Sequence, residues 1–576
     1  MILSGNDIRT GDRLNAALVV IGAGPAGVVA ALEAATRGID TILLETGNRK
    51  PIDANQDLSV AQRVQPDLHA PVEIAVSRQI GGTSAIWGGR CVPYDPVDFL
   101  EREALPGSVW PVRFSDVEPY FPAACEWMKC GRPVFDVTEM PHLPHAMIPG
   151  LDDGEVLTSA LERWSLPTNF GRVYYDDLDA RHNLRLICDS TCVRIDLAAG
   201  DDARVESVHC RTLSGREFSI SADNVIVANG GLEATRLLMA SAGRDGRPGI
   251  GNHSEHLGHW YMAHLEGVIA NLELTTPRES TIYEYERDVD GSYVRRRFTF
   301  DTEFIVDNGL PNISGWIANP ELADAAHANA RLSLTYLLLI SPIGRFLAPD
   351  AQRLSLTGTK IPGTPYGMAT RSPVGAHLRN ILRHPLDAIA FALQFGVQRV
   401  FGRGRRPPGF FVGNSRNQYP LQYHAEHLPH YDSKVELSDE VDALGMPKLA
   451  IDIRFTDEDV QGVLDAHRHW DQYLRSAQVG RLQYLSDDLH AAVRERTGGG
   501  FHQVGTTRMS KAPEDGVVDE NLTVHGVRNL HVASSSVFVT SGQANSTFMI
   551  VVFVLRLIDH LYGKGTEGAR QGDGRA

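Results

Sequence analysis

Near its N-terminus the chain reads Leu18-Val19-Val20-Ile21-Gly22-Ala23-Gly24-Pro25-Ala26-Gly27, and a second apolar run, residues 40–44, ends at Glu45. The first run is typical of a buried parallel strand, and the alanine-rich residues 28–35 after the glycines predict a helix. Gly22 permits the tight turn, Gly24 lets the backbone approach a pyrophosphate, and Gly27 lets helix and strand pack closely. Such turns also occur without a nucleotide, but both strands and the terminal acid favour a dinucleotide site.

The helix after Gly24 would present free backbone N–H groups to a diphosphate, with Pro25 and Ala26 in its first turn. Glu45 can bind the ribose hydroxyls of an adenosine. These residues suit FAD and NAD equally, so this motif predicts an adenine dinucleotide without choosing between them.

A second glycine-rich loop runs from Arg78 to Arg90 and contains Gly81-Gly82-Thr83-Ser84 and Trp87. FAD needs a second loop of this kind, because its pyrophosphate and isoalloxazine ring extend well beyond the adenosine. An ordinary surface loop is the alternative.

Composition narrows the class of protein. The 576 residues exceed one ordinary core and predict two or more domains. A net charge of −16 argues against a nucleic-acid-binding protein. We expect no secretory signal and no transmembrane segment, because the N-terminus lacks a basic and apolar leader and no apolar run is long enough. Six cysteines without a CxxC pair predict no disulfide framework, haem attachment or structural zinc, and a cytoplasmic location.

Two polar residues near the C-terminus stand in distinctive settings. Phe501 to Met509 reads FHQVGTTRM and contains His502, and Thr540 to Thr547 reads TSGQANST and contains Asn545. Histidine is a natural base because its unperturbed pKa lies near neutral pH, and an uncharged amide can orient an alcohol oxygen. The alternatives are a buried core histidine and a plain cap of the apolar helix expected over 546–560.

These motifs resemble those of the glucose–methanol–choline (GMC) family of FAD-dependent oxidoreductases over nearly the whole chain. The segments that stand in family order are the glycine turn, the Gly-Gly-Thr-Ser loop, Trp110-Pro111 to Tyr120-Phe121, the second βα unit at 224–231, the strand at 433–438, the His502 motif, and Val518-Asp519 through Asn545.

The resemblance implies an α/β fold, with a Rossmann-type FAD-binding domain and a discontinuous α+β substrate domain built on an antiparallel sheet. The FAD-binding domain would comprise residues 1–110, 180–260 and 495–576, and the substrate domain 111–179 and 261–494. Apolar and polar residues alternate over 451–456, as a half-buried strand of such a sheet requires.

The resemblance also implies a site. His502 would be the base and Asn545 would orient the substrate oxygen over the flavin. The residues expected to contact FAD are Gly22, Gly24, Pro25, Ala26, Gly27, Glu45, Gly81, Gly82, Thr83, Ser84, Trp87, Ala228, Ser534, Ser535, Asn545, Ser546 and Thr547.

The chain departs from the family pattern at three positions. Pyranose-oxidase-like members tether the flavin through a histidine just before the loop tryptophan; Ile86 stands there, so we expect non-covalent FAD. Many members have a proline where Ser546 stands and an aspartate where Ser534 stands, which puts the family's ribityl contacts in doubt.

Other candidates carry weaker signals. Gln422, His424 and Glu426 precede the strand at 433–438 and are low-ranking candidates for substrate contact. His253, His256, His259 and His264 superficially resemble a metal site, but no metal-binding motif supports them, so we expect structural histidines and no metal.

Residues 337–406 do not resemble the family core. They include a helical stretch over about 374–401 and four arginines, Arg399, Arg403, Arg405 and Arg406. A lid, an oligomer contact and a membrane-surface patch are all compatible with them. A solvated helix end before Pro407-Pro408 is the plainer interpretation.

We therefore expect an enzyme that oxidises a CH–OH group, with O2 or a quinone or redox carrier as electron acceptor. A sugar, glycoside or polyol is the favoured substrate, by general likeness to the pyranose-oxidase and glucoside-dehydrogenase branch. The alternatives are an oxidase of a non-sugar alcohol, a hydroxynitrile-lyase-like enzyme on the same scaffold and a flavoprotein electron carrier. Oligomeric state and substrate identity stay open.

Overall fold

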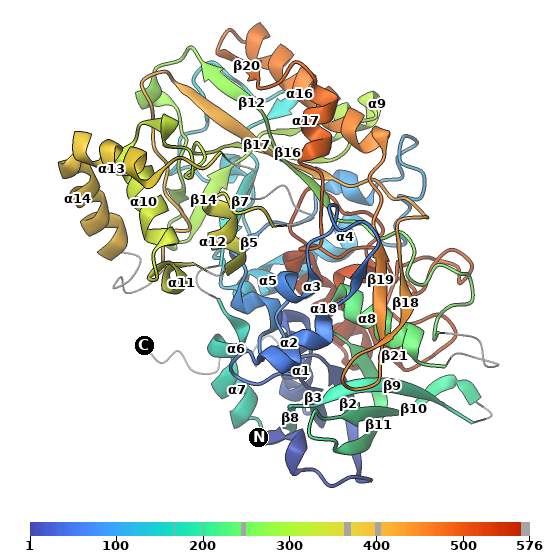
Figure 1. The fold of residues 1–576 in the computed structure, drawn as a ribbon. Helices are drawn as coiled ribbons and strands as arrows, with labels where there is room; N and C mark the ends of the chain where they lie inside the picture. The colour runs from blue at the N-terminus through green and yellow to red at the C-terminus, as the bar shows by residue number, and fades with distance from the viewer. Residues whose placement is uncertain are drawn as a thin grey trace.

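The computed structural model describes residues 1–165, 168–199, 201–242, 249–348, 350–361, 370–397 and 405–565. In Figure 1 a large sheet lies in the lower half of the molecule, a smaller sheet lies in the upper half, and a group of helices projects from one side of the upper half.

The large sheet has the strand order β1-β8-β3-β2-β11-β10-β9, with β21 also paired to β11. Its parallel centre consists of β8 (Leu184–Cys188), β3 (Thr41–Leu44), β2 (Arg13–Ile21), β11 (Glu217–Val227) and β21 (Leu530–Val532). These strands come from three separate parts of the chain. The strands expected over 18–21 and 40–44, the βα unit at 224–231 and the apolar helix, α18 (Thr547–Tyr562), are confirmed. The strand expected over 451–456 is wrong in its bounds, because the strand there, β19 (Pro447–Asp452), ends at Asp452 and a helix begins at Asp457.

Helix α1 (Pro25–Thr36) begins directly after the glycine turn. Gly22 has a φ of +101°, and a Cβ on it would lie 2.6 Å from the Cα of Asn229. A Cβ on Gly27 would lie 1.8 Å from the carbonyl oxygen of Gly22. Both positions therefore require glycine, because backbone occupies the space of a side chain.

The smaller sheet is antiparallel, with the order β16-β17-β12-β20. Its strands are β16 (Ile313–Ile317), β17 (Gln418–Glu426), β12 (His264–Leu274) and β20 (Gly480–Tyr484), and α16 (Asp457–Ser476) packs beside β20.

Each of the two sheets has a hydrophobic core of its own. The core of the large sheet also takes in side chains between Val112 and Leu178, which the expected boundaries assign to the substrate domain. The domain limits stay a prediction.

The remaining strands are β1 (Ile2–Ser4), β4 (Gln62–Arg63), β5 (Arg90–Cys91), β6 (Val156–Leu157), β7 (Leu161–Trp164), β9 (Thr191–Ala198), β10 (Asp201–Arg211), β13 (Glu286–Arg287), β14 (Tyr293–Arg296), β15 (Thr299–Phe300), β18 (Lys434–Val441) and β19 (Pro447–Asp452). The remaining helices outside the projecting group are α2 (Asp53–Gln56), α3 (Val72–Ala75), α4 (Phe114–Val117), α5 (Phe121–Met128), α6 (Phe170–Val173), α7 (Tyr175–Ala180), α8 (Gly231–Ala240), α9 (Thr302–Asn308) and α17 (Leu489–Glu495).

The projecting helices are α10 (Ala330–Ile340), α11 (Gly344–Leu347), α12 (Asp350–Leu356), α13 (Val374–Arg383), α14 (Pro385–Phe391) and a π-helix over Ala392–Gly396. The helical stretch expected from residue 374 is thus broken at His384, because the residue before a proline is disfavoured in helical geometry. In Figure 1 α13 and α14 form the outermost layer.

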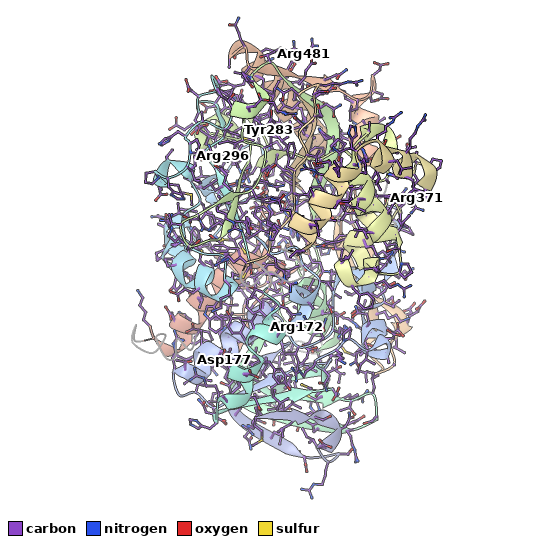
Figure 2. All side chains as sticks on the ribbon, turned by 90° about the vertical axis from the view of Figure 1, so that its left-hand side faces the viewer. Arg172, Asp177, Tyr283, Arg296, Arg371 and Arg481 are labelled. Atoms are coloured by element: carbon purple, nitrogen blue, oxygen red, sulfur yellow. The ribbon has the colours of Figure 1, made fainter. Side chains whose placement is uncertain are left out.

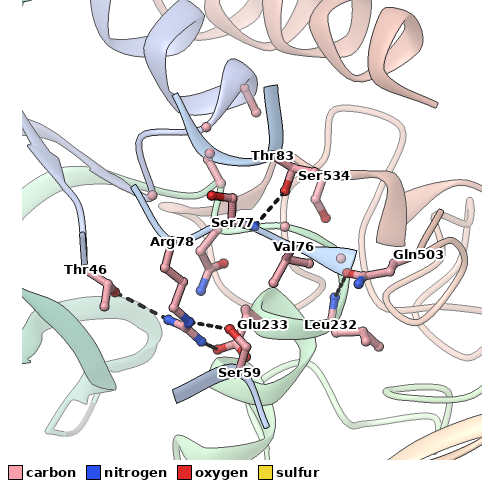
Figure 3. A pocket seen from close by; sticks show the side chains of 18 of the residues that line it. Thr46, Ser59, Val76, Ser77, Arg78, Thr83, Leu232, Glu233, Gln503 and Ser534 are labelled. Carbon is pink, nitrogen blue, oxygen red and sulfur yellow. Dashed lines mark hydrogen bonds and ion pairs between the residues drawn. The ribbon is translucent and has the colours of Figure 1, made fainter. Parts of the chain in front are cut away.

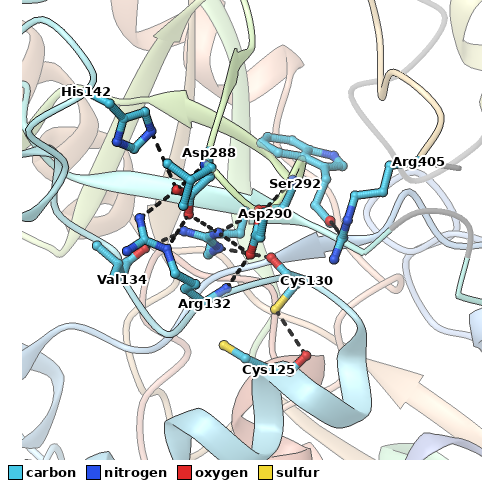
Figure 4. Close-up of polar contacts among 12 residues, drawn as sticks. Cys125, Cys130, Arg132, Val134, His142, Asp288, Asp290, Ser292 and Arg405 are labelled. Carbon is cyan, nitrogen blue, oxygen red and sulfur yellow. Dashed lines mark hydrogen bonds and ion pairs between the residues drawn. The ribbon is translucent and has the colours of Figure 1, made fainter. Parts of the chain in front are cut away.

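Two of the four arginines at the end of this segment can be placed. Arg405 donates to the backbone oxygens of Lys129 and Trp164, beside the Arg132–Asp288 ion pair (Figure 4). Arg406 is described but lies in no helix or strand, and Arg399 and Arg403 lie outside the described residues. Arg405 therefore holds the returning chain against the body of the protein.

All six cysteines are buried and free. Within the described ranges, no helix has the length and apolarity needed to cross a membrane.

Candidate functional site

A cavity is lined by the glycine turn and by the carboxyl ends of β2 and β3. Figure 3 shows some of the other residues in its wall. The expected FAD contacts that line it are Gly22, Gly24, Pro25, Ala26, Glu45, Gly82, Thr83, Ser84, Trp87, Ala228, Ser534, Ser535, Ser546 and Thr547. Gly27 and Gly81 do not line it, because each packs against neighbouring backbone. Asn545 is also absent from the lining and lies instead beside His502, which does line the cavity.

The cavity fits a dinucleotide in two ways. A Cβ on Gly24 or Gly230 would meet nothing within 4 Å, so backbone is open to the cavity at both positions. The side-chain oxygen of Asn229, in the same wall, is buried without a hydrogen-bond partner among the described residues. A buried polar atom of this kind usually has a partner, which a bound group can supply.

Glu45 lies at the expected end of the strand. Its two carboxylate oxygens accept from the backbone N–H groups of Ala23, at 2.9 Å, and Gly47, at 2.8 Å. Burial raises the pKa of this carboxyl group, and the two backbone hydrogen bonds oppose the rise. The side chain is therefore held in place in the wall of the cavity, at the end of β3.

The cavity wall also contains hydrogen-bonded and ion-paired residues that the sequence motifs do not predict as FAD contacts. Arg78 pairs with Glu233 at 2.7 Å and donates to Ser59 at 2.6 Å, and the Gln503 side chain accepts from the N–H of Leu232 (Figure 3). Arg78 is the first residue of the glycine-rich loop at 78–90, but no local sequence pattern indicates that Glu233 lies opposite it.

His502 and Asn545 are in contact. The Nε2 atom of His502 lies 2.8 Å from the amide nitrogen of Asn545, whose oxygen accepts from Arg90 at 2.9 Å. On its other side, Nδ1 of His502 lies 2.9 Å from Nδ1 of His264. Nε2 of His264 in turn lies 3.2 Å from the carbonyl oxygen of Ser541.

This chain of contacts fixes which nitrogen of His502 carries a proton. A carbonyl oxygen can only accept, so His264 carries its proton on Nε2 and accepts at Nδ1. The Nδ1–H of His502 is the donor to that atom. Nε2 of His502 is therefore left with a lone pair, toward which the Asn545 amide points.

The surroundings keep these imidazoles neutral. Burial, followed by the nearby charge of Arg90, lowers the pKa of His502 to about 4. Burial also lowers the pKa of His264 and His424. His502 is consequently unprotonated at neutral pH, as a base must be.

His264 was expected to be structural together with His253, His256 and His259, and the structure separates it from them. The rings of those three bond backbone oxygens of His525, Glu514 and Tyr431 at the surface. His264 instead lies on β12, buried beside His502. Register explains why sequence spacing missed it: His264 pairs with Glu426 on β17, in a sheet that packs over the C-terminal loops.

The candidates Gln422, His424 and Glu426 share one face of β17, because alternate residues of a strand point the same way. They are placed differently. Glu426 is bound by Arg102 through two contacts of 2.8 Å and lines neither cavity. His424 stacks on His264, with ring centroids 4.2 Å apart. Gln422 lines a second cavity.

His264, His424 and His502 also bring possible metal-ligand atoms within 4.8 Å of one another. Several of these nitrogens are engaged by each other or by the backbone oxygens of Ser541 and Gln543. The absence of a metal stays a prediction.

The second cavity, of about 750 Å³, lies between the smaller sheet and the projecting helices. Trp316 and Gln422 form part of its floor, and Arg90 packs over the Trp316 ring at 5.0 Å. A Cβ on Gly88, next to Trp87, would lie 3.7 Å from Gln352 in its wall. Single layers of side chains thus separate it from the contact between Arg90 and Asn545 and from the glycine-rich loop at 78–90.

Comparisons with known proteins agree with this architecture. A family model described as GMC oxidoreductase matches residues 429–553, and one described as FAD binding domain matches residues 17–54. Paromamine 6'-oxidase of Streptomyces fradiae is 24% identical over 333 residues, which span 49% of this chain and 59% of that protein. 2-Methyl-1,2-propanediol dehydrogenase of Mycolicibacterium austroafricanum is 21% identical over 84% of this chain and 80% of its own.

Two solved structures share the fold. Pyridoxine 4-oxidase from Mesorbium loti superposes with a TM-score of 0.52 at 16% identity, covering 96% of this chain and 100% of its own. A fungal aryl-alcohol oxidase superposes with a TM-score of 0.51 at 14% identity, covering 95% of this chain and 98% of its own. Residues 429–553 of this chain thus match the GMC oxidoreductase family, residues 17–54 match an FAD-binding domain, and the chain shares the fold of these two oxidases over nearly its full length.

Proposed function

We propose that the protein oxidises the CH–OH group of a small-molecule alcohol, with His502 as base and Asn545 as the group that orients the alcohol oxygen. The observation that carries this proposal is the lone pair on Nε2 of His502, which is turned toward Asn545 at the edge of the cofactor cavity. When bound there, FAD would accept the hydride from the carbinol carbon.

The chain's own residues handle the proton. The alcohol would enter between His502 and Asn545, donate its hydroxyl hydrogen to Nε2 and accept from the amide N–H that now faces Nε2. As the hydride leaves, the hydroxyl proton passes to Nε2 and the substrate becomes a carbonyl compound. Arg90 keeps the Asn545 oxygen occupied, so that the N–H stays turned toward the substrate.

The finer features of the cofactor site belong to the same proposal. Non-covalent FAD is supported by Ile86, which has no nucleophilic atom to bond the ring. Ser546 and Thr547 line the cofactor cavity at the start of α18, whose N-terminus is positive and would stabilise an anionic reduced flavin.

We further propose an FAD-binding part over 1–110, 180–260 and 495–576 and a substrate part over 111–179 and 261–494. The two separate cores support a division into two parts, although side chains between Val112 and Leu178 pack with the core of the large sheet. The preference for a sugar or polyol is supported by the two relatives, named as oxidising paromamine and 2-methyl-1,2-propanediol.

Anaerobic mixing with sugars, glycosides, polyols and apolar alcohols tests the reaction. If the protein oxidises alcohols, a substrate bleaches the absorbance of the oxidised flavin. If it is a hydroxynitrile-lyase-like enzyme, the flavin absorbance stays unchanged while a cyanohydrin is formed or cleaved. If no alcohol reduces the flavin, the proposed function is wrong. Repeating the positive reactions with O2 or a quinone identifies the acceptor.

The pH dependence of flavin reduction follows from the lowered pKa of His502. The neutral imidazole is the active form, and it persists until the pH falls to about 4. We expect kcat/KM to be flat above about pH 5 and to fall tenfold per unit below about pH 4. Stopped-flow pH jumps, brief enough to precede acid unfolding, measure this profile. A midpoint near the ordinary histidine value would contradict it.

Replacing His264 by leucine removes the acceptor for Nδ1–H of His502. We expect kcat for flavin reduction to fall about 10- to 100-fold, the cost of one buried hydrogen bond, with little change in KM. His264→Gln, which keeps an acceptor oxygen, should restore most of the rate. His264 does not position His502 if both variants lose the same factor in kcat. The same conclusion follows if the variants bind less FAD but the FAD that stays bound is reduced at the parent rate.

A further inference from the structure

The outside of the projecting helices is apolar. Seven apolar residues spaced three or four apart lie along α13, α14, the π-helix and the residue after it, and we call them the outer apolar face: Val374, Leu378, Leu382, Leu386, Ile389, Leu393 and Val397. All seven are exposed, with exposed fractions of 77% for Leu382, 81% for Leu386 and 63% for Leu393. So many exposed apolar residues on neighbouring helices indicate a binding surface.

The inward side of α13 is polar, which is the reverse of an ordinary surface helix. His377 is buried, stacks on Tyr336 at 4.2 Å and contacts Ser333 at 3.2 Å. The Asn380 amide donates to the backbone oxygen of Ala325 at 2.9 Å. Hydrogen bonds of His377 and Asn380 thus hold α13 against the protein, and its leucines remain available to contact a binding partner.

The charge around the outer apolar face indicates what kind of surface binds to it. Residues 337–406 contain ten lysines and arginines against two acidic residues, in a chain whose net charge is −16. Arg379 and Arg383 are exposed and follow Leu378 and Leu382 by one residue, about 100° around the helix. Figure 2 shows Arg371 at the outer edge of the same helices. Exposed leucines flanked by arginines are the pattern of a helix lying on an anionic bilayer.

The second cavity lies directly behind this layer. Phe391 and Phe395, on the helices that carry Leu386 and Leu393, line it, as do Leu338 and Leu356. Leu338 and Leu356 are 37% and 44% exposed, so this part of the apolar wall is open and not packed against other side chains. An apolar alcohol leaving a membrane would reach the cavity through this region.

We propose that the outer apolar face binds the surface of an anionic lipid bilayer, and that the second cavity receives an alcohol dissolved in that bilayer. The second half rests on the proposed alcohol oxidation, with an apolar alcohol as substrate in place of the sugar or polyol that the two relatives support; the first half does not depend on it. A second copy of the chain fits less well, because a two-fold interface through this face would set Arg379 and Arg383 of one copy near the same arginines of the other.

Sedimentation with vesicles tests the surface. The FAD-loaded full chain should sediment with phosphatidylcholine vesicles that contain about one third phosphatidylglycerol, and less with phosphatidylcholine alone. Added salt should weaken the binding. Leu382→Asp, Leu386→Asp and Leu393→Asp should each lower the partition coefficient at least about tenfold. Arg379→Glu with Arg383→Glu should remove the preference for the anionic lipid.

Val64→Asp, Leu213→Asp and Val289→Asp are matched controls, because these apolar residues are also exposed but lie on other surfaces. They should bind vesicles like the parent protein. Failure of the parent to bind anionic vesicles overturns the proposal. So does a dimer that forms without vesicles and is lost in the leucine variants, since the face would then join two copies.

Rates of flavin reduction distinguish a failure of membrane binding from a failure of the proposed alcohol oxidation. The leucine variants should reduce their flavin normally with a water-soluble alcohol, and lose at least about tenfold in rate only toward an apolar alcohol supplied in vesicles. Equal rates from vesicles in parent and variants would overturn entry from the bilayer.

Discussion

Replacing His502 by alanine is expected to slow reduction of the bound flavin by an alcohol about 100- to 10,000-fold, the usual contribution of a positioned base. The variant should keep its FAD, because most of the cofactor cavity is built from the glycine turn and the Gly-Gly-Thr-Ser loop. Anaerobic stopped-flow measurement of the flavin absorbance gives the rate, and the visible spectrum gives the FAD content.

His259→Ala is the matched control for this change. Its ring stacks on Tyr431 at 4.0 Å on the surface, away from both cavities, so its loss should leave the rate unchanged. If His502→Ala reduced its flavin as fast as the parent protein, His502 would not be the base. An electron carrier without an alcohol substrate would give that result.

Replacing Gly24 by valine is expected to weaken FAD binding at least about 100-fold while leaving the fold intact. A Cβ on Gly24 meets nothing within 4 Å, so the new side chain begins in the open space of the cavity. It would hold the diphosphate away from the first turn of α1. Two charge-assisted hydrogen bonds, worth roughly 1.5–3 kcal/mol each, would be lost.

Titration of the apoprotein with FAD measures this loss, and circular dichroism checks the fold. Gly375→Val is the control, since a Cβ there also meets nothing within 4 Å but faces away from the cofactor cavity. Unchanged FAD affinity in Gly24→Val would mean that the diphosphate does not lie against the glycine turn.

Local patterns were enough to predict the dinucleotide-binding half of the fold. The strand, glycine turn and helix around Gly22 are decided by residues close together in sequence, and so is the apolar α18. The meeting of His502 with Asn545 followed only from the family resemblance, because nothing in their spacing brings them together.

Other parts of the site depend on long-range register, which a single sequence does not carry. His264 reaches His502 because β12 pairs with β17 beside the C-terminal loops, and Arg90 reaches Asn545 across most of the chain. Periodicity likewise gives an apolar stripe on α13, but it does not say whether that stripe faces inward. Only the buried positions of His377 and Asn380 decide it.

The order of the strands in the large sheet has a consequence for how the protein is made. β2, which carries the glycine turn, is synthesised long before β21, His502 and α18, and α18 packs on α1. A chain emerging from the ribosome therefore exposes the apolar side of α1 until α18 has also emerged. A nascent chain of this kind depends on chaperones for longer than one whose first domain closes early.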